Sequence, residues 1–512
     1  MTQKKMSALD KFFGYTAKGS NLRTEIVAGI TTFFAMAYIL MVNANMFAHP
    51  FAQGADLGPN ILGVSYNAIY IATAISAVVG TLAIGLLANL PLAQASGMGL
   101  NAFFVYTCCV TLKMSYANAL VLVLFDGVLF IILTVTGLRK MIFKAIPQTV
   151  RVAIPAGIGL FIAFLGLQNA GIVVADTSTG VTLGSFNLLS SPDVTNEAIA
   201  KTLTELGMNP AALTSGNILT YNWFRIMPMV VTIIALFAIA IMSFRKVKGS
   251  VLLGIVGGTA LYYLLGFGTI TNFGNTLKIS MASPFDAFKA FGTESFGKVF
   301  TEGFNFTAFF EANGTANAIL TIVTTTLAFC MVDMFDTLGT LYGACSRGNM
   351  LTEDGEVPNM DKAMLADAIA TTTGAICGTS TVTTFVEASS GVAEGGRTGM
   401  SAMVTAALFF IAMFLSPLAQ LIPGCATAAA LVYVGVLMVI GVRNIDWDDA
   451  TEAVPAFLTL AMMPFTYNIS YGICFGLISY IVIKACTGKI KEVKVGTYVI
   501  AALFLAMLLL TH

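Results

Sequence analysis

Two aspartates, Asp333 and Asp336, lie three residues apart within a long apolar run, and neither has a lysine or arginine within four residues along the chain. Residues with this spacing share one face of a helix. Two carboxylates this close in a medium of low dielectric cannot both ionise cheaply, so we expect one of them to hold a proton. A carboxyl group that takes up and releases a proton is what proton coupling requires. The alternative is that the helix end has reached water and both aspartates are solvated.

A third acid, Glu387, lies in a polar, glycine-rich stretch (379–399) bounded on both sides by apolar segments. Irregular chain at membrane depth occurs only inside protein or beside a cavity, because lipid cannot satisfy backbone polar groups. An acid at that depth is costly and indicates a functional site. We expect Glu387 to accept hydrogen bonds from the ring N–H groups of a planar ligand; its alternative role is to cap the helix that begins near Ala388. Glu394 and Arg397 are expected to pair with each other or with water.

The composition is that of a polytopic membrane protein. Of the 512 residues, 57% are hydrophobic and 10% charged, whereas soluble domains carry about 25% charged residues. Positive and negative charges balance at 26 each, which gives no indication of nucleic-acid binding. The eight cysteines are scattered and only two histidines are present. We therefore expect no metal, no cofactor and no enzymatic activity, all of which would need clustered ligands or nucleophiles.

The positive charges predict the orientation of the chain. Five lysines and arginines precede the first apolar run, and further clusters follow alternate runs, whereas the loops at 49–66 and 172–221 hold almost none. Cytoplasmic loops carry the excess of lysine and arginine. We expect a multi-pass protein of the cell (inner or plasma) membrane with a cytoplasmic N-terminus.

Apolar runs of helix length predict fourteen helices. They cover 26–48, 67–87, 101–110, 117–137, 150–173, 223–243, 251–266, 316–342, 363–378, 398–415, 426–440, 453–467, 472–484 and 499–510. The region 453–484 stays open, because it is either two crossings or one crossing broken at Pro464. The two alternatives place the C-terminus on opposite sides of the membrane.

An internal repeat relates the two halves. Residues 146–147 (Ile-Pro) precede an apolar helix that ends in 166–169 (Gly-Leu-Gln-Asn), and residues 422–423 (Ile-Pro) precede another that ends in 441–444 (Gly-Val-Arg-Asn). The charge alternation directs the first helix outward and the second inward. This is the pattern that inverted-topology repeats produce.

The repeat gives the stretch around Glu387 a partner at 91–104, since paired interrupted segments indicate a transporter's binding site. The residues just before Glu387 are β-branched, and we expect a strand of two or three residues there. In the partner, Asn101 could read the edge of a heterocycle or satisfy a helix start. Phe103, Phe104 and Phe385 could stack on a flat ring, although packing is the commoner role of phenylalanine.

Three further acids, Glu25, Asp126 and Asp367, lie in or near apolar runs. We interpret them as helix-end or inter-helix partners rather than as transport residues.

Four strings resemble those of the AzgA-like purine branch (hypoxanthine, guanine, adenine) of the nucleobase–cation symporter-2 family. They are 20–25 (SNLRTE), 97–104 (GMGLNAFF), 333–339 (DMFDTLG) and 383–399 (TTFVEASSGVAEGGRTG). They span the chain from its start to about residue 400, and the hydropathy pattern continues beyond them. The last string is specific, whereas the glycine strings alone would be weak.

The resemblance implies an all-α polytopic membrane protein of 14 transmembrane helices arranged as a 7+7 inverted repeat. Helices 1–4 and 8–11 would form a core domain and helices 5–7 and 12–14 a gate domain, with short antiparallel strands in helices 3 and 10 meeting at the midplane. On this division, residues 1–24 are a cytoplasmic segment, 25–145 and 315–420 form the core, and 146–314 and 421–512 form the gate.

The resemblance also implies the site residues. The base would lie between Asp333 and Glu387, Asp336 matches a second acid of the purine branch, and Asn101 and Gly99 match its helix-3 positions. The uracil and xanthine branches usually have Glu at the Asp333 position, and the shorter Asp leaves more room for a bicyclic purine. The residues expected to bind substrate are Glu387, Asp333, Asn101, Phe385 and Gly99, and those expected to couple protons are Asp336 and Asp333.

The function that follows is a secondary active transporter that imports purine nucleobases by proton symport with alternating access. Its expected partners are a purine, a proton and the lipid bilayer, and a homodimer is compatible with them. One alternative is a xanthine/uracil-type permease. The other is an anion carrier or channel of the same general fold, which a basic residue where helices 3 and 10 meet would favour; the nearest basic residue is Arg397. The preferred purine is not readable from the residues.

Overall fold

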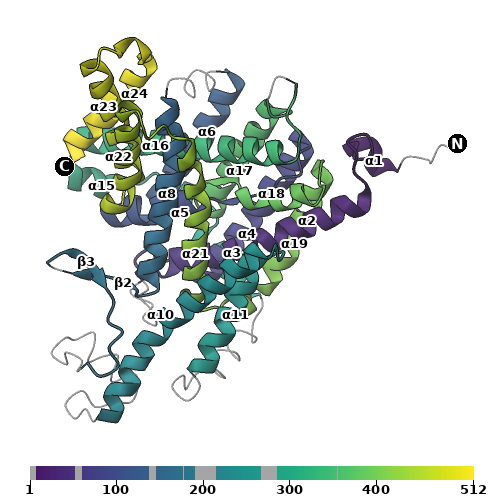
Figure 1. Ribbon diagram of the computed structural model, residues 1–512, viewed down its shortest axis with the longest axis vertical. Coiled ribbons are helices and arrows are strands. Elements are labelled where there is room, and N and C mark those ends of the chain that lie inside the picture. Colours follow the sequence, from purple (N-terminus) through teal and green to yellow (C-terminus); the bar gives the residue numbers. More distant parts are fainter. Residues whose placement is uncertain are drawn as a thin grey trace.

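The computed structural model describes residues 7–51, 60–137, 146–176, 178–190, 215–266, 285–353 and 356–511. These residues are mainly helical (Figure 1). Within them, nine helices are long and apolar enough to cross a membrane. The shorter elements complete the fold, and two of its segments are interrupted by a short strand.

The first half of the chain runs from α1 to α11. Its elements are α1 (Ala8–Phe13), α2 (Leu22–Met36), α3 (Tyr38–Ala48), α4 (Tyr66–Ala83), β1 (Gln94–Ser96), α5 (Met98–Ala102), α6 (Tyr116–Val135), α8 (Gln148–Asn169), β2 (Val173–Asp176), β3 (Gly180–Leu183), α10 (Ser215–Phe244) and α11 (Ser250–Leu265). Stretches of π-helix extend α4 to Ala88 and α5 to Thr111.

The second half runs from α13 to α24. Its elements are α13 (Asp286–Ala290), α14 (Lys298–Thr301), α15 (Thr307–Asn313), α16 (Thr315–Arg347), α17 (Met360–Cys377), β4 (Val382–Thr384), α18 (Ser389–Ala393), α19 (Gly399–Ala412), α20 (Ser416–Ala419), α21 (Gly424–Val439), α22 (Ala450–Thr466), α23 (Ile469–Cys486) and α24 (Val495–Thr511). A short 3-10 turn, Val386–Ala388, precedes α18.

Short polar side chains begin several of the helices. Asn21, Ser65 and Ser115 accept hydrogen bonds from backbone N–H groups in the first turns of α2, α4 and α6. Such caps satisfy donors that a helix leaves unpaired at its start. The two helices of the predicted internal repeat, α8 and α21, instead both follow a proline, Pro147 and Pro423.

The packing repeats between the two halves. Helix α2 packs on α19 as α16 packs on α6, and α4 packs on α19 as α17 packs on α6. In the same way, α21 contacts α10 and α11 while α8 contacts α22 and α23. Helices α8 and α21 lie against each other near the centre, with α22 and α23 towards one end and α10 and α11 towards the other (Figure 1). The predicted all-α fold with a 7+7 inverted repeat is confirmed.

The region 453–484 forms two antiparallel helices, so the alternative of one broken crossing is wrong. Near one end of the pair, Lys484 of α23 forms an ion pair with Glu452 of α22 at 2.7 Å. The chain turns at Tyr467, which has a left-handed φ of 53°, and Asn468 caps α23. Pro464 lies inside α22 without ending it.

The predicted list of fourteen helices omits one member of the repeat. The predicted helix 499–510 is present as α24, and among the described elements it has no counterpart in the repeated packing. The repeat instead takes the interrupted segment β4–α18 as its tenth member and α23 as its fourteenth. Hydropathy missed the tenth because that segment is short and polar.

Glu25 and Arg397 both serve helix ends. The carboxylate of Glu25 accepts from the backbone N–H of Arg397 at 2.9 Å and from the hydroxyl of Ser401 at 2.5 Å, which holds the start of α19. This is the inter-helix role expected of Glu25. The expected pairing of Arg397 with Glu394 is wrong, because the Arg397 guanidinium donates to main-chain carbonyls and Glu394 pairs with Lys248 at 2.7 Å.

Candidate substrate site

Two short strands from opposite halves of the chain meet inside the protein. Strand β1 pairs with β4 in antiparallel register, with Gln94 opposite Thr384 and Ser96 opposite Val382. Both strands are wholly buried, and α5 begins just after β1 while a helical turn begins just after β4. The predicted strand before Glu387 is confirmed. The half-helix N-termini therefore start at the strand pair, where their backbone N–H groups favour negative charge or acceptor atoms.

Four carboxyl groups surround β4, and threonine hydroxyls connect each of them to the strand. The first two contacts are direct. Thr383 donates to Asp336 at 3.1 Å, and Thr381 donates to Asp126 at 3.3 Å. Asp126 was expected to be an inter-helix partner, and its wholly buried side chain on α6 contacts Thr381, the residue just before β4.

Asp333 contacts the strand through Thr371. The Thr371 hydroxyl lies 3.2 Å from the Asp333 carboxyl and 3.1 Å from the main-chain carbonyl of Val382. One hydroxyl carries a single proton, so it cannot donate to both oxygens at once. If Thr371 donates to Val382, then Asp333 can complete the chain only as a protonated acid. The Thr371 hydroxyl thus connects the Asp333 carboxyl to the backbone of β4.

Asp367 is held at the end of the strand pair by two donors. Thr337 donates to it at 2.8 Å and the Gln94 amide donates at 2.9 Å. The same Gln94 amide lies 3.1 Å from the hydroxyl of Thr384. Asp367 therefore joins α16, α17 and both strands, which is the inter-helix role that we expected for it.

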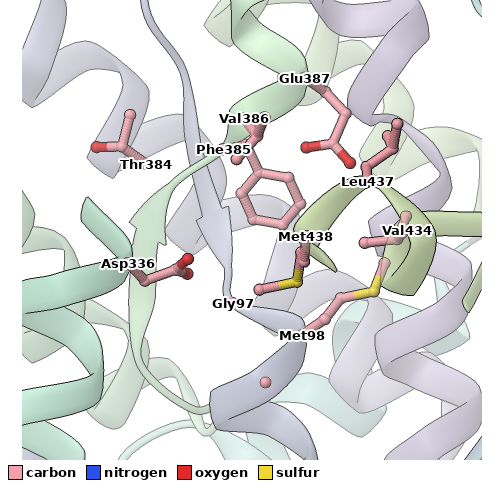
Figure 2. Close-up of a pocket in the computed structure, with 11 residues that line it drawn as sticks. Gly97, Met98, Asp336, Thr384, Phe385, Val386, Glu387, Val434, Leu437 and Met438 are labelled. Atoms are coloured by element: carbon pink, nitrogen blue, oxygen red, sulfur yellow. The ribbon is translucent and has the colours of Figure 1, made fainter. Parts of the chain in front are cut away.

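A small pocket opens beside the strands (Figure 2). The strands and half-helices supply one side, and α21 supplies the other. It is lined by Gly97, Met98, Gly99, Asp336, Thr384, Phe385, Val386, Glu387, Val434, Leu437 and Met438. In Figure 2 the Asp336 and Glu387 carboxylates lie on either side of the Phe385 ring. The cavity volume is about 50 Å³, so a flat bicyclic ligand requires flexible side chains such as Met98 and Met438 to move.

Glu387 reaches the pocket rather than the helix start. Its Oε1 atom accepts a hydrogen bond from the Tyr38 hydroxyl at 2.5 Å. No described main-chain N–H of another residue is bonded to its carboxylate, so the capping alternative receives no support. Nor does any lysine, arginine or histidine form an ion pair with Glu387, Asp336, Asp333 or Asp126 in the described ranges. The two pocket carboxylates therefore offer acceptor atoms, and none of the residues that line the pocket is a lysine, arginine or histidine.

Four of the six predicted site residues lie together on the pocket wall: Glu387, Asp336, Phe385 and Gly99. Asp333 and Asn101 are wholly buried in the layer behind the strands. The Asn101 carbonyl oxygen accepts from Ser96 at 3.0 Å and from Ser380, so this side chain fixes the strand ends instead of lining the pocket.

Phe103 and Phe104, the other stacking candidates, pack within the protein. Phe103 forms an edge contact with Phe329, and Phe104 stacks on Phe47. The commoner role of phenylalanine therefore holds for both of them, and Phe385 alone of the three lines the pocket.

The site also contains residues that the sequence analysis did not identify. Val434, Leu437 and Met438 come from an apolar face of an apolar helix, and Tyr38 stands alone in the first membrane segment. The one available signal was the repeat, since it predicts that α21 crosses the centre of the fold.

Comparison with known sequences now decides the family. The family model of the xanthine/uracil permeases, described as "Permease family", matches residues 23–203 and 194–475. The chain belongs to this family. The permease is 33% identical to the adenine permease AdeP of Escherichia coli over 97% of this chain and 95% of that protein. It is 36% identical to the guanine/hypoxanthine permease PbuO of Bacillus subtilis over 96% and 98%, and 38% identical to a putative permease of Methanocaldococcus jannaschii over 98% of each.

Solved structures share the fold of the permease. The transmembrane domain of the cyanobacterial bicarbonate transporter BicA matches with a TM-score of 0.50 and 16% identity, covering 90% of this chain and 96% of that one. The murine anion transporter Slc26a9 in its inward-facing state matches with a TM-score of 0.54 and 11% identity, covering 95% and 74%. At such identities the likeness concerns the fold alone.

Gly99 of the permease is a point of close approach between the pocket wall and α8. A Cβ atom added there would lie 2.3 Å from Cγ2 of Ile158. We expect Gly99→Ala to lower the free energy of unfolding by about 1–3 kcal/mol and to impair transport, because the enlarged side chain obstructs the contact between α5 and α8. Thermal unfolding and uptake measure the two effects.

The matched control is Gly339→Ala, where an added Cβ meets nothing within 4 Å. Removing the obstructing methyl group with Ile158→Ala should restore part of the lost activity in the double variant. Wild-type stability and uptake in Gly99→Ala would contradict the steric explanation.

Proposed function

We propose that the permease imports purine nucleobases together with protons. The observation that carries the proposal is a pocket with two carboxylates, Asp336 and Glu387, an aromatic ring and no lining lysine, arginine or histidine. Such a site suits a flat, uncharged ring that presents N–H donors. The names of the relatives, adenine permease and guanine/hypoxanthine permease, support a purine.

In the proposed cycle a proton first binds to the carboxyl group of Asp333 or Asp336. The purine then binds with ring N–H groups on Glu387 and its face against Phe385, and it meets the backbone at the strand ends. The core, which contains the strands, next moves against the gate, which contributes Val434 and Leu437. Release of the base and the proton on the other side returns the protein to its starting state.

The hydrogen bonds of Asp333 support its role as a proton carrier. Thr371 lies between its carboxyl and the Val382 carbonyl of β4, so gaining or losing the proton changes which oxygen the hydroxyl can serve. This change would make or break the hydrogen bond between Thr371 and the Val382 carbonyl of β4, the strand that leads to Phe385 and Glu387.

The two alternatives receive less support. An anion carrier would need a cation in the pocket, but the Arg397 guanidinium is occupied by the carbonyls of Val392 and Gly396 at 2.7 Å each. A xanthine or uracil permease fits the family model equally well. Against it stands the Asp at position 333; the relatives' names divide, since two are an adenine permease and a guanine/hypoxanthine permease and a third, 34% identical, is a putative xanthine/uracil permease of Schizosaccharomyces pombe.

The orientation and assembly belong to the same proposal. We place the N-terminus in the cytoplasm of a cell whose inner or plasma membrane holds the protein, and we keep the core and gate limits predicted above. A homodimer is compatible with this arrangement. The lysine and arginine distribution supports the orientation.

The test is uptake of labelled hypoxanthine, guanine and adenine by cells that lack their own purine permeases. We expect concentrative uptake of at least one base, and a protonophore should abolish the concentration gradient. Uptake that ignores the protonophore would refute proton coupling, and no uptake of any base would refute the substrate class. A purine at 100 times its Kd should also stabilise the purified protein by about 2.7 kcal/mol, whereas bicarbonate and sulfate should not.

A further inference from the structure

Tyr38 lies behind the pocket acid and contacts it directly. Its hydroxyl donates to Oε1 of Glu387 at 2.5 Å. Tyr38 is the first residue of α3 and is separated from the end of α2 by Ala37 alone, and its side chain is 0% exposed. Glu387 is partly exposed and lines the pocket. The hydrogen bond therefore joins the buried Tyr38, in the first membrane segment, to Glu387, which lines the pocket.

We propose that Tyr38 is a positioning residue, which holds the Glu387 carboxylate in the geometry that accepts a ring N–H and so sets the affinity of the site for bases carrying that donor. This inference rests on the function proposed above and deepens it. Tyr38 does not line the pocket, so it acts through Glu387 rather than on the base.

The first argument is conformational. A glutamate side chain has three rotatable bonds, and an unheld carboxylate would lose that freedom each time a base bound. Across the described residues, the Tyr38 hydroxyl is the one donor from another residue to this carboxylate. The Ser390 hydroxyl bonds to the main-chain carbonyl of Glu387 at 2.7 Å, so the backbone is fixed separately. Only the side-chain torsions depend on Tyr38.

The second argument concerns the two carboxylate oxygens. Tyr38 takes one acceptor site of Oε1, so Oε2 is the oxygen to which no other described residue donates. A hydroxyl bonds more strongly to a carboxylate than to a neutral acid, so the pair favours a Glu387 that accepts hydrogen bonds. A base edge with an N–H can then donate to the carboxylate. An edge with a lone pair at that position would place one acceptor atom against another, which is repulsive.

The test is Tyr38→Phe, which keeps the buried ring and removes the hydroxyl. We expect the KM for the transported purine to rise about tenfold, as for the loss of a hydrogen bond to a charged group, while Vmax changes less than about twofold. The matched control is Tyr70→Phe, because Tyr70 is also buried and its hydroxyl donates to the Ala412 carbonyl at 3.0 Å, away from the pocket. Its KM should equal that of the wild type.

The double variant Tyr38→Phe/Glu387→Gln separates positioning from a general packing role. If Tyr38 acts through Glu387, removing its hydroxyl should matter less once the carboxylate is gone, and the tenfold effect should shrink to about threefold or less. The inference is overturned if Tyr38→Phe leaves KM unchanged, if it lowers Vmax alone, or if its effect is fully additive. The wild-type arm keeps the two proposals apart, because wild-type protein that transports no purine refutes the proposed function as well.

Discussion

Replacing Glu387 by glutamine is expected to reduce Vmax/KM for purine uptake about 10- to 150-fold, the range for loss of a hydrogen bond to a charged group. The amide keeps the size of the side chain and can still accept from Tyr38. It lacks the negative charge, and its NH2 group can face the ring N–H of the base. The variant should reach the membrane in normal amount, so the loss appears in initial uptake rates measured against purine concentration.

Glu394→Gln is the matched control for this variant. Glu394 lies seven residues further on, and its ion pair with Lys248 is partly exposed, so the change should cost no more than about twofold. Equal effects of the two substitutions would show that the pocket acid has no special role. Wild-type kinetics in Glu387→Gln would show that Glu387 does not bind the base.

Asp333→Asn is expected to abolish concentrative uptake while leaving exchange of purine across the membrane. The amide is neutral at every pH, so the layer behind the strands can no longer take up or release a proton at this position. Wild-type uptake should fall as the external pH rises, because the proton is a co-substrate, and uptake by the variant should be flat. Accumulation ratios with and without a protonophore measure the difference, which we expect to reach at least about tenfold for a loss of about 1.4 kcal/mol of coupling.

Asp126→Asn is the comparison that makes this result specific. Asp126 is equally buried and accepts from the hydroxyl of Thr381, the residue just before β4, at 3.3 Å, but the proposed cycle assigns it no proton. Its accumulation ratio should stay sensitive to the protonophore. If Asp126→Asn lost that sensitivity and Asp333→Asn kept it, the proton carrier would be Asp126.

The positions of the strands could be predicted, whereas much of the surrounding site could not. The β-branched residues before Glu387 predicted β4, and the family resemblance implied a partner strand in the first half, where β1 lies. The signal existed because polar, glycine-rich chain is rare at membrane depth. The same signal placed Glu387 and Gly99 in one region of the fold.

The opposite wall of the pocket gave no such signal. Val434, Leu437 and Met438 are ordinary residues of an apolar helix, and hydropathy cannot tell a pocket wall from a lipid-facing surface. Tyr38 is likewise one tyrosine among 15, and its partner is 349 residues away. Long-range contacts of this kind depend on the tertiary arrangement, which the local pattern does not encode.

Asp333 and Asn101 show a different limit. The motif identified both as important, but it could not say whether they face the ligand or the layer behind it. Both side chains are 0% exposed, and their hydrogen bonds run to threonine and serine near the strands. Spacing along a helix fixes which residues share a face, but it does not fix what that face meets.

The pairing of β1 with β4 has a consequence for the two halves of the chain. Each strand has its hydrogen-bonding partner in the other half, so neither half contains a complete site. The two halves therefore resemble a pair of subunits inserted head to tail and joined by a linker. Separately expressed halves should recover transport only when produced together, since the first contributes β1 and Gly99 and the second contributes β4 and Glu387.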